Sequence, residues 1–528
     1  MKRTERYALA ALAIGLPVLV LGPSLLRGGF VGDEGVDVWS HVWGMAWFAD
    51  SLVHFQVPWT ADGLRHPEGG VLWYIDVLGA LLATPWMAMG AMVAGYNLVL
   101  VAQSVLAAVS GWFWERSLGG AGPTAAVALA TTPFLLCTWS NGVLEAGWLG
   151  LVALAGALAM RESRLAGLVV GLAFVATPYL GISAAVVAGV ALLTRGNYRL
   201  LAWTWGIGAV VALPMALGLA AGFDDPRSLA IKPPPGPRWP TWRINGVDPR
   251  AFIQPGDFWS VRIHGDGAPP FKRTPYLGIT VLVGTVVALV RRRVAAGWVL
   301  PVLVGVVLAL GPVLYFGGDF VRWASGDVVW LPFGWVWSLT GVGMDHPLRF
   351  VSMALVVLAG CAGAAVGPKL RFSALLAGVV AVEHLAVAPN VWPLPTSDGT
   401  VPMVYDALEG PGAVIDLPAD KGGTMETSRY LYWHAVHGRP IPYGNKVSGD
   451  LLRVDNDALR RWMARRSPRR ADRRDLAWLY GHGYRFVVVH RSMCGEGCSE
   501  LVARVSTDLG TPEVVGEDWV WRVPGEPG

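Results

Sequence analysis

The chain has 528 residues, of which 53% are hydrophobic and only 15% are charged, and its formal net charge at pH 7 is +4. A net charge this small does not predict binding to nucleic acid. The apolar residues fall in blocks of about 17 to 25 residues with few charges, which is typical of transmembrane helices. We therefore expect an integral protein of the lipid bilayer.

The first apolar block, YALAALAIGLPVLVLGPSLL, follows the basic segment MKRTER. It has the length of a secretory signal sequence, but it lacks a small-residue cleavage pattern and further apolar blocks follow it. We expect this block to be retained as a membrane anchor.

Eleven apolar blocks predict transmembrane spans, and their basic connectors all fall on one side of the membrane. The positive-inside rule assigns that side to the cytoplasm. The N-terminus is then cytoplasmic, and an odd number of spans places the C-terminal segment on the other side. The predicted spans are 7–27, 97–114, 121–138, 143–160, 165–178, 180–194, 200–222, 275–290, 295–316, 349–367 and 372–388.

The block at residues 71–94 is also long enough to cross, but it contains Asp76 and Pro85. A single crossing here would put the earlier basic connectors on the opposite side from the later ones. We therefore predict a re-entrant or interfacial hairpin on the outer face. The outer face then carries the loops 28–96, 223–274 and 317–348.

Three acidic residues, Asp33, Glu34 and Asp37, lie close together at the start of the first outer loop. One interpretation is a solvated loop in which Asp37 caps the following helix. The other is a base or metal site at the boundary between water and membrane, because a carboxylate can accept a proton from an incoming hydroxyl and a neighbour can hold a divalent cation. Spacing alone leaves both open.

The next segment repeats tryptophan every four residues, at Trp39, Trp43 and Trp47. This spacing predicts one face of an amphipathic helix whose tryptophans lie at headgroup depth. A lipid-linked substrate would present its headgroup at the same depth.

Residues 391–528 differ in composition from the membrane part at 1–390. Buried strands are predicted at GAVIDLP and YRFVVVH, helices at TSRYLYWHAVHG and RDLAWLYGHG, and closing strands at EVVGEDWVWRVP. This alternation predicts a small extracytoplasmic α/β domain. The spacing of Cys494 and Cys498 suits a local disulfide in that compartment, or a metal half-site if the segment is cytoplasmic.

Taken together, these motifs resemble the GT-C superfamily of polytopic glycosyltransferases that use polyprenyl-phosphate-linked sugars, especially bacterial members with a soluble C-terminal domain. The resemblance covers most of the chain, and the order of the motifs carries it. The matching stretches are GDEGVDVWSHVWGMAWF, HPEGGVLWYID, YNLVLVAQSVLAAVSGWFWERSL, TPYLG, RTPYLGITVLVG, DHPLRFVSMALVVLAG, VEHLAVAP and YRFVVVH. The implied fold is mainly α, a polytopic bundle of about 11 spans with a small α/β domain.

The resemblance implies a catalytic acid in the first outer loop, which corresponds to Asp33, with Glu34 completing an acidic pair and Asp37 as the alternative match. By the same likeness, Arg349 would face the lipid phosphate, although an arginine at a helix end also reaches toward headgroups. Any divalent cation, Mg²⁺ or Mn²⁺, would be held by Asp33 and Glu34. The sequence departs from the pattern in having no DxD motif and no clear second acid, for which Asp76 and Glu145 are the substitutes.

Two histidines in the outer loops, His66 and His346, are further candidates for substrate contact, together with Asp76. A histidine beside a phosphate can donate a hydrogen bond to it. The alternative for both histidines is ordinary exposure to solvent.

These expectations converge on an inverting glycosyltransferase of the bacterial inner membrane. It would transfer a sugar from a polyprenyl-phosphate donor to a glycan, lipid or protein acceptor on the outer face. The alternatives are a non-catalytic envelope assembly protein with the same fold, or a lipid or solute carrier. A carrier needs polar groups deep inside several spans, and the predicted spans are nearly free of charge there.

Overall fold

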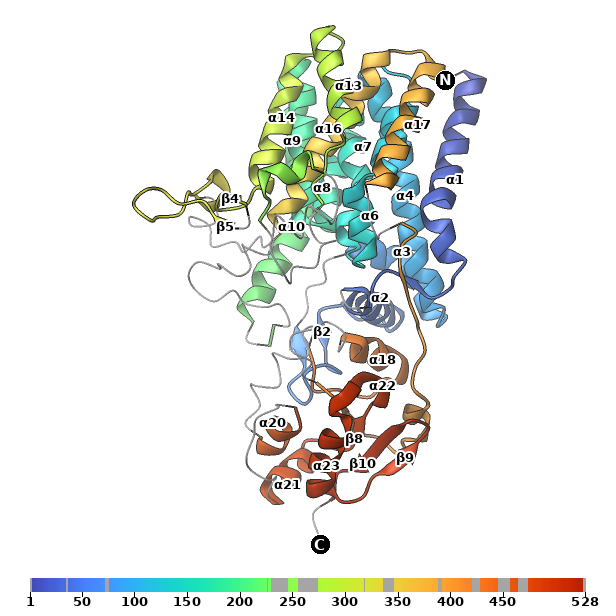
Figure 1. Cartoon of the computed structure of the whole chain (residues 1–528), viewed down its shortest axis with the longest axis vertical. Coiled ribbons are helices and arrows are strands. Elements are labelled where there is room, and N and C mark those ends of the chain that lie inside the picture. The colour runs from blue at the N-terminus through green and yellow to red at the C-terminus, as the bar shows by residue number, and fades with distance from the viewer. Residues whose placement is uncertain are drawn as a thin grey trace.

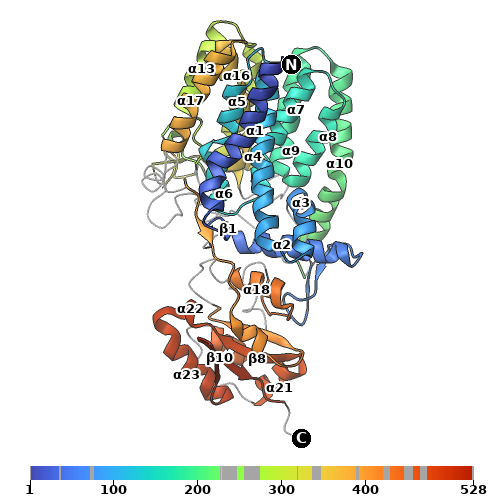
Figure 2. The same ribbon diagram turned by 90° about the vertical axis from the view of Figure 1, so that its right-hand side faces the viewer.

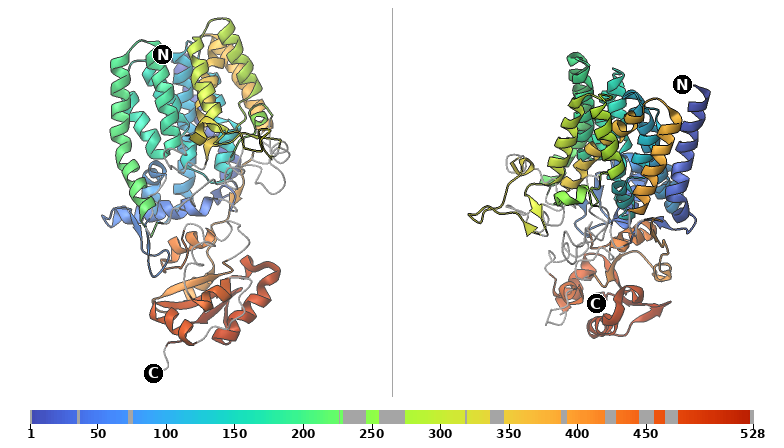
Figure 3. Two further views of the ribbon diagram at one scale, coloured as in Figure 1. Left: turned by 90° about the vertical axis from the view of Figure 1, so that its left-hand side faces the viewer. Right: turned by 45° about the horizontal axis from the view of Figure 1, so that its top comes forward.

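The structure is a computed structural model that describes residues 2–34, 37–71, 76–225, 227–228, 246–254, 274–317, 319–335, 346–387, 392–419, 428–444, 456–463 and 473–525. A bundle of helices carries the N-terminus at one end, and a smaller part built around a β-sheet lies beyond the opposite end (Figure 1). Two further views show the same separation (Figure 3). Most of the predicted outer loop 223–274 lies outside the described residues.

In the part of the chain that the structure describes, four helices are long and apolar enough to cross a membrane by length and composition. They are α1 (Arg3–Leu25), α4 (Met92–Ser117), the Tyr198–Gly222 part of α10 (Tyr198–Asp224), and α16 (Val351–Val366) with the 3-10 turn η5 (Pro347–Phe350) before it. Shorter apolar helices surround them, namely α7 (Gly150–Met160), α8 (Leu165–Ala176), α9 (Pro178–Thr194), α13 (Ile279–Val290), α14 (Val299–Ala309) and α17 (Leu370–Ala386). A helix therefore lies in every block that the sequence marks as apolar, and the number of spans stays a prediction.

The predicted span 121–138 is not one continuous helix. It is divided into α5 (Pro123–Ala130) and α6 (Pro133–Ser140), and Thr132, the second of the two residues between them, has an extended backbone with ψ 134°. Proline has no N–H to continue the helix, and its ring disfavours a helical conformation in the preceding residue. Pro133 therefore ends one helix and begins the next.

After α1 the chain leaves the bundle, and it re-enters the bundle at the same end to form α4. Glu5 and Arg116 form an ion pair of 2.9 Å at one end of these two helices. At the other end, the Asn97 side chain accepts a hydrogen bond from the Val31 N–H and donates one to the Gly29 carbonyl. The intervening helices α2 (Val38–Val53) and α3 (Val77–Ala88) lie near that second end (Figure 2).

Trp39 and Trp43 of α2 do not face lipid headgroups, as the sequence pattern suggested, but are covered by protein. Trp39 and Trp43 are 0% and 2% exposed. Trp39 stacks on Tyr432 of α18 (Arg429–His437) with ring centroids 5.0 Å apart, and Trp43 stacks on Trp47. The prediction was wrong here because a second segment, distant in sequence, packs against the same face of α2.

The C-terminal part is built on a four-stranded sheet in the order β7-β8-β10-β9. Its strands are β7 (Ala413–Leu417), β8 (Tyr484–Val489), β9 (Glu513–Val515) and β10 (Asp518–Arg522). The β7-β8 pair is parallel and the other pairs are antiparallel. Helices α18, α20 (Asp457–Met463) and α21 (Arg473–Gly481) come between β7 and β8, and α22 (Arg491–Cys494) and α23 (Cys498–Leu509) follow β8.

Three short antiparallel pairs complete the described strands. The pair β1 (Phe30–Val31) and β6 (Thr396–Ser397) joins the end of the first long helix to the start of the C-terminal part. The others are β2 (Thr60–Ala61) with β3 (Gly70–Val71), and β4 (Tyr315–Phe316) with β5 (Asp319–Phe320).

Candidate functional site

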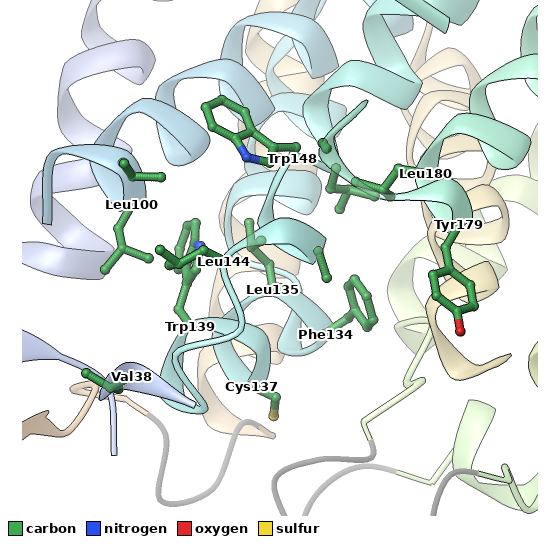
Figure 4. Close-up of a cluster of buried hydrophobic side chains, with 14 of the residues drawn as sticks. Val38, Leu100, Phe134, Leu135, Cys137, Trp139, Leu144, Trp148, Tyr179 and Leu180 are labelled. Atoms are coloured by element: carbon green, nitrogen blue, oxygen red, sulfur yellow. The ribbon is translucent and has the colours of Figure 1, made fainter. Parts of the chain in front are cut away.

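A small cavity of about 80 Å³ opens where α2, α6 and η5 meet. Its polar lining includes Asp37, Asn141 and Arg349, and the exposed His346 lies at its edge. Apolar side chains of α6 close one wall, among them Cys137 and Phe134, and Phe134 lies near Tyr179 of α9 (Figure 4). The cavity thus brings together polar residues that are far apart in the sequence.

Asp37 is fixed at this cavity by close packing between the start of α2 and the end of α6. Its backbone N–H donates to the Asn141 carbonyl at 3.0 Å. Gly142 makes the approach possible, because it has φ +69° and a Cβ there would lie 2.6 Å from the Val38 nitrogen. Only glycine combines this backbone conformation with so close a contact. The side chain of Asp37 makes no hydrogen bond that would cap α2.

Arg349 reaches the cavity from η5 and is held by a carboxylate. Its Nη2 atom lies 2.8 Å from Oε1 of Glu145, and the guanidinium lies over the Tyr179 ring at 5.5 Å from the centroid. The Tyr179 hydroxyl in turn accepts a hydrogen bond from the His346 N–H at 2.8 Å. The guanidinium is therefore directed into the protein and positioned on two sides.

Glu145 also contacts His41, which lies one helical turn after Asp37 on α2. The distance from His41 Nε2 to Glu145 Oε2 is 3.2 Å, and both side chains are buried. A chain of charged and polar groups therefore runs from His41 through Glu145 to Arg349. Such a chain fixes side-chain positions well, because each member constrains the next.

Asp76 belongs to the protein interior beside this chain and is not among the residues that line the cavity. Its Oδ1 atom accepts hydrogen bonds from the Trp148 indole N–H and the Gly79 N–H, both at 2.9 Å. The residue is fully buried and caps α3. Its contacts are those of a structural cap.

The other two acids of the first loop lie differently from Asp37. Glu34 forms an ion pair of 3.2 Å with Arg429 of α18, and Arg429 also lies over the Trp39 ring. Asp33 is half-buried, and its backbone N–H donates to the Ser140 carbonyl at 2.7 Å. Within the described residues, the cavity lining includes Asp37 but neither Asp33 nor Glu34.

The same arrangement bears on the predicted divalent cation. Glu34 already has a cationic partner in Arg429. In the part of the chain that the structure describes, no three or more His, Cys, Asp or Glu side chains are grouped as metal ligands. These residues do not form a ligand set for Mg²⁺ or Mn²⁺, and we derive no step through a metal.

His66 and the two cysteines lie in or against the C-terminal part. His66 Nε2 is 2.6 Å from the His482 carbonyl oxygen, and its ring meets Tyr484 edge-on. Burial lowers the pKa of His66, which disfavours the cationic form that would attract a phosphate. Cys494 and Cys498 are joined in a disulfide at the junction of α22 and α23.

Sequence reasoning did not identify His41, and it named Glu145 only as a substitute acid. Glu145 carried a usable signal, because an ionisable residue inside an apolar block usually faces protein or a cavity. His41 carried only its spacing, four residues after Asp37 on the same helix face.

Comparison with known proteins gives structural likeness without sequence likeness. No family model matches the chain, and no curated protein is significantly similar to it in sequence. The oligosaccharyltransferase of Archaeoglobus fulgidus, tethered to an acceptor peptide containing the NVT sequon, aligns with a TM-score of 0.52 at 12% identity over 96% of this chain and 71% of that one. ArnT from Cupriavidus metallidurans, bound to undecaprenyl phosphate, aligns with a TM-score of 0.49 at 12% identity over 98% of both chains.

At this identity the likeness concerns the fold alone. The expected fold is confirmed at that level: this chain shares the fold of the archaeal oligosaccharyltransferase, a GT-C glycosyltransferase.

Proposed function

We propose that this chain is a membrane glycosyltransferase that transfers a sugar from a polyprenyl-phosphate donor to an acceptor hydroxyl. One observation carries the proposal: Asp37 and Arg349, from opposite ends of the membrane part, line the same cavity. A carboxylate and a guanidinium are the two groups that such a transfer needs. The GT-C fold, shared with enzymes of this class, supports the same conclusion.

The chemistry follows from these two groups. The Asp37 carboxylate accepts the proton of the acceptor hydroxyl as its oxygen attacks the anomeric carbon. The bond from that carbon to the phosphate oxygen breaks, and the lipid phosphate leaves with the electron pair. Arg349 binds the departing phosphate through charge-assisted hydrogen bonds. A single displacement inverts the configuration at the anomeric carbon.

We assign the base to Asp37 rather than to Asp33 because of what each carboxylate faces. The cavity lining includes Asp37 and Arg349 together, whereas the Glu34 neighbour of Asp33 is paired with Arg429. In this assignment, Asp33 and Glu34 hold the first outer loop against the rest of the protein. A divalent cation remains a prediction from the family resemblance alone.

The distribution of charge supports a non-cytoplasmic cavity. The ion pair between Glu5 and Arg116 lies at the end of the bundle that carries the N-terminus (Figure 1). The basic connectors that contain Arg164, Arg199 and Arg291 lie at this end as well (Figure 2). The positive-inside rule would make this end cytoplasmic and place the cavity and the disulfide on the outer side. We propose the inner membrane of a bacterium as the location.

The volume of the cavity favours a second candidate. Small-molecule sites usually have about 300 to 1,000 Å³, and this cavity has about 80 Å³ within the described residues. A site this small is expected in a protein that has the same fold but assists envelope assembly without transferring a sugar. The experiment below distinguishes the two.

The test is release of free polyprenyl phosphate by the purified full-length protein in nanodiscs, measured against a panel of lipid-linked sugars. We expect release with at least one donor, a loss of about 100-fold or more in Asp37→Asn, and little change in Asp33→Asn as the matched control. Full activity of Asp37→Asn would remove Asp37 from the proposed role. Absence of release with every donor, in a correctly folded protein, would favour the assembly function.

A further inference from the structure

A second and larger cavity, of about 680 Å³, lies at the opposite end of the bundle from the candidate site. It is formed by the C-terminal end of α13, the turn between α16 and α17, and the first half of α17. These three elements lie together at the end that carries the N-terminus (Figure 1, Figure 2). We call this cavity the basic groove, and nothing in the proposed transfer reaction uses it.

Three cations from two separate connectors converge on the basic groove: Arg291, Arg293 and Lys369. Arg292, between the first two, adopts φ +53° and is not part of the lining. The backbone closes there as the Arg293 N–H donates to the Ala288 carbonyl at 2.8 Å. This left-handed residue turns the chain so that the two flanking arginines border the same cavity.

The side chain of Arg293 lies close to Gly367, at the end of α16. Gly367 has φ +70°, and a Cβ at this position would lie 3.5 Å from Nη1 of Arg293. The lining of the groove contains no acidic residue. Among the described residues, Arg291, Arg293 and Lys369 make no ion pair with a carboxylate. The groove therefore has three positive charges without a carboxylate partner in the described part of the protein, and Lys369 lies over the Phe372 ring at 5.7 Å from the centroid.

The rest of the groove is apolar and open. Phe372, Leu375, Leu376 and Val379 follow one another on one face of α17 at helical spacing. Leu375 is 69% exposed and Val379 is 49% exposed, so protein does not cover this face. The groove thus combines a positively charged end with an apolar strip that runs along a helix.

Another cavity, beside α8 and α10, shows that this combination is not general at this end of the bundle. That cavity has about 780 Å³ and is lined by Arg164 and Arg199, but its lining also contains Glu162. The Glu162 carboxylate accepts a hydrogen bond from Asn197 at 2.9 Å. The positive charge of this other cavity is therefore partly compensated within the protein, unlike that of the basic groove.

We propose that the basic groove binds an anionic phospholipid. The phosphate group would lie among Arg291, Arg293 and Lys369, and one acyl chain would lie along the apolar face of α17. Basic pockets between helices at a membrane surface attract anionic headgroups, with about 1 kcal/mol for each cation. The apolar half identifies a lipid rather than a free phosphate, because a soluble phosphate ester gains nothing from Leu375 and Val379.

The experiment is native mass spectrometry of the full-length protein released from nanodiscs of mixed phosphatidylglycerol and phosphatidylcholine. We expect one phosphatidylglycerol to be retained selectively. The triple variant R291Q/R293Q/K369Q should bind it roughly 100-fold more weakly, since three cations are lost. The matched control, R6Q/R195Q/R292Q, removes three exposed cations from the same end outside the groove and should bind like the wild type.

Three results would overturn the proposal. The first is a triple variant that retains as much phosphatidylglycerol as the wild type. The second is a control variant that loses as much affinity as the triple variant, which would mean that only overall charge matters. The third is competition by soluble glycerol phosphate at equal concentration, which would assign the site to a free phosphate. Leu375→Gln adds a test of the apolar half: it should weaken binding of a long-chain phosphatidylglycerol more than that of a short-chain one.

Discussion

Arg349 and Glu145 form an ion pair of 2.8 Å inside the protein, with the arginine side chain 14% exposed and the glutamate 5%. The pair fixes the guanidinium at the cavity that Asp37 also lines. The second carboxylate oxygen of Glu145, Oε2, lies 3.2 Å from Nε2 of His41. Glu145 is therefore a positioning residue between a cation at the site and a histidine behind it.

Removing Glu145 should destabilise the protein more than removing both members of the pair. Glu145→Ala leaves the buried Arg349 without its counter-charge, which typically costs about 3 to 5 kcal/mol. The double variant E145A/R349A removes the unpaired charge as well, so it should be more stable than the sum of the single variants predicts. Unfolding in detergent, followed for all four proteins, measures this coupling. Additive changes would mean that the two side chains do not interact in the folded protein.

Replacing Gly142 should disturb the site through the backbone. Gly142→Ala combines a positive φ with a Cβ 2.6 Å from the Val38 nitrogen, so the start of α2 and Asp37 must move. We expect loss of most transfer activity. Gly119→Ala is the matched control, because Gly119 has φ +89° but nothing within 4 Å of its Cβ position. It should cost about 1 to 2 kcal/mol of stability from backbone strain alone and leave turnover unchanged. Equal effects of the two variants would contradict the close contact with α2.

The docking of α18 on α2 should depend on its stacked rings rather than on its surface ion pair. Glu34 is 51% exposed, and pairs of this kind contribute about 0 to 1 kcal/mol. The Trp39 and Tyr432 rings are buried and stacked, and truncation of a large buried aromatic typically costs about 3 to 5 kcal/mol. Hydrogen exchange in α2 should therefore rise strongly in Tyr432→Ala and little in Glu34→Gln. A larger rise in Glu34→Gln would reverse this ranking.

The C-terminal sheet should lose stability as the pH rises. His490 is buried between Asp416, at 3.0 Å, and Asp518, at 3.1 Å. Burial lowers the pKa of His490, but hydrogen bonds to the two carboxylates outweigh it, so the pKa is raised above its usual value. Folding then favours the protonated ring. The stabilisation is complete below the unfolded pKa of about 6.5 and is lost as the pH rises through the folded value.

Hydrogen exchange in β7 and β8 between pH 6 and pH 9 measures this dependence. His490→Asn keeps a hydrogen-bonding side chain but cannot take up the proton, so its profile should be flat over this range. Tyr405, which donates to the same Asp416 carboxylate at 2.8 Å, keeps that contact in the variant. A wild-type profile as flat as that of the variant would show that His490 is neutral in the folded protein.

The sequence predicted the parts of this fold that depend on local pattern. Apolar blocks located the helices. The break between α5 and α6 was not predicted, although Pro133 carried a signal for it. The burial of Trp39 could not be predicted, because it depends on Tyr432, nearly four hundred residues later. The pattern of α2 was correct as a helix, but its surroundings were set by a distant segment.

The same limit applies to the candidate site. Sequence spacing placed Asp33, Glu34 and Asp37 in one loop without separating their roles. The structure separates them through Gly142, which brings α2 to α6, and through Arg429, which contacts Glu34. The pairing of Arg349 with Glu145 is likewise a tertiary contact between η5 and η1 (Glu145–Gly147). No local pattern encodes such a meeting.

The β1-β6 pair has a consequence for biogenesis. Phe30 pairs with Ser397, so the edge of the first loop gains its strand partner only after almost the whole membrane part has been synthesised and inserted. Until β6 has been translated, the segment that leads to Asp37 lacks its strand partner. The newly made protein should therefore complete the region around Asp37 late, in one step that couples β1 to a strand more than three hundred residues further along the chain.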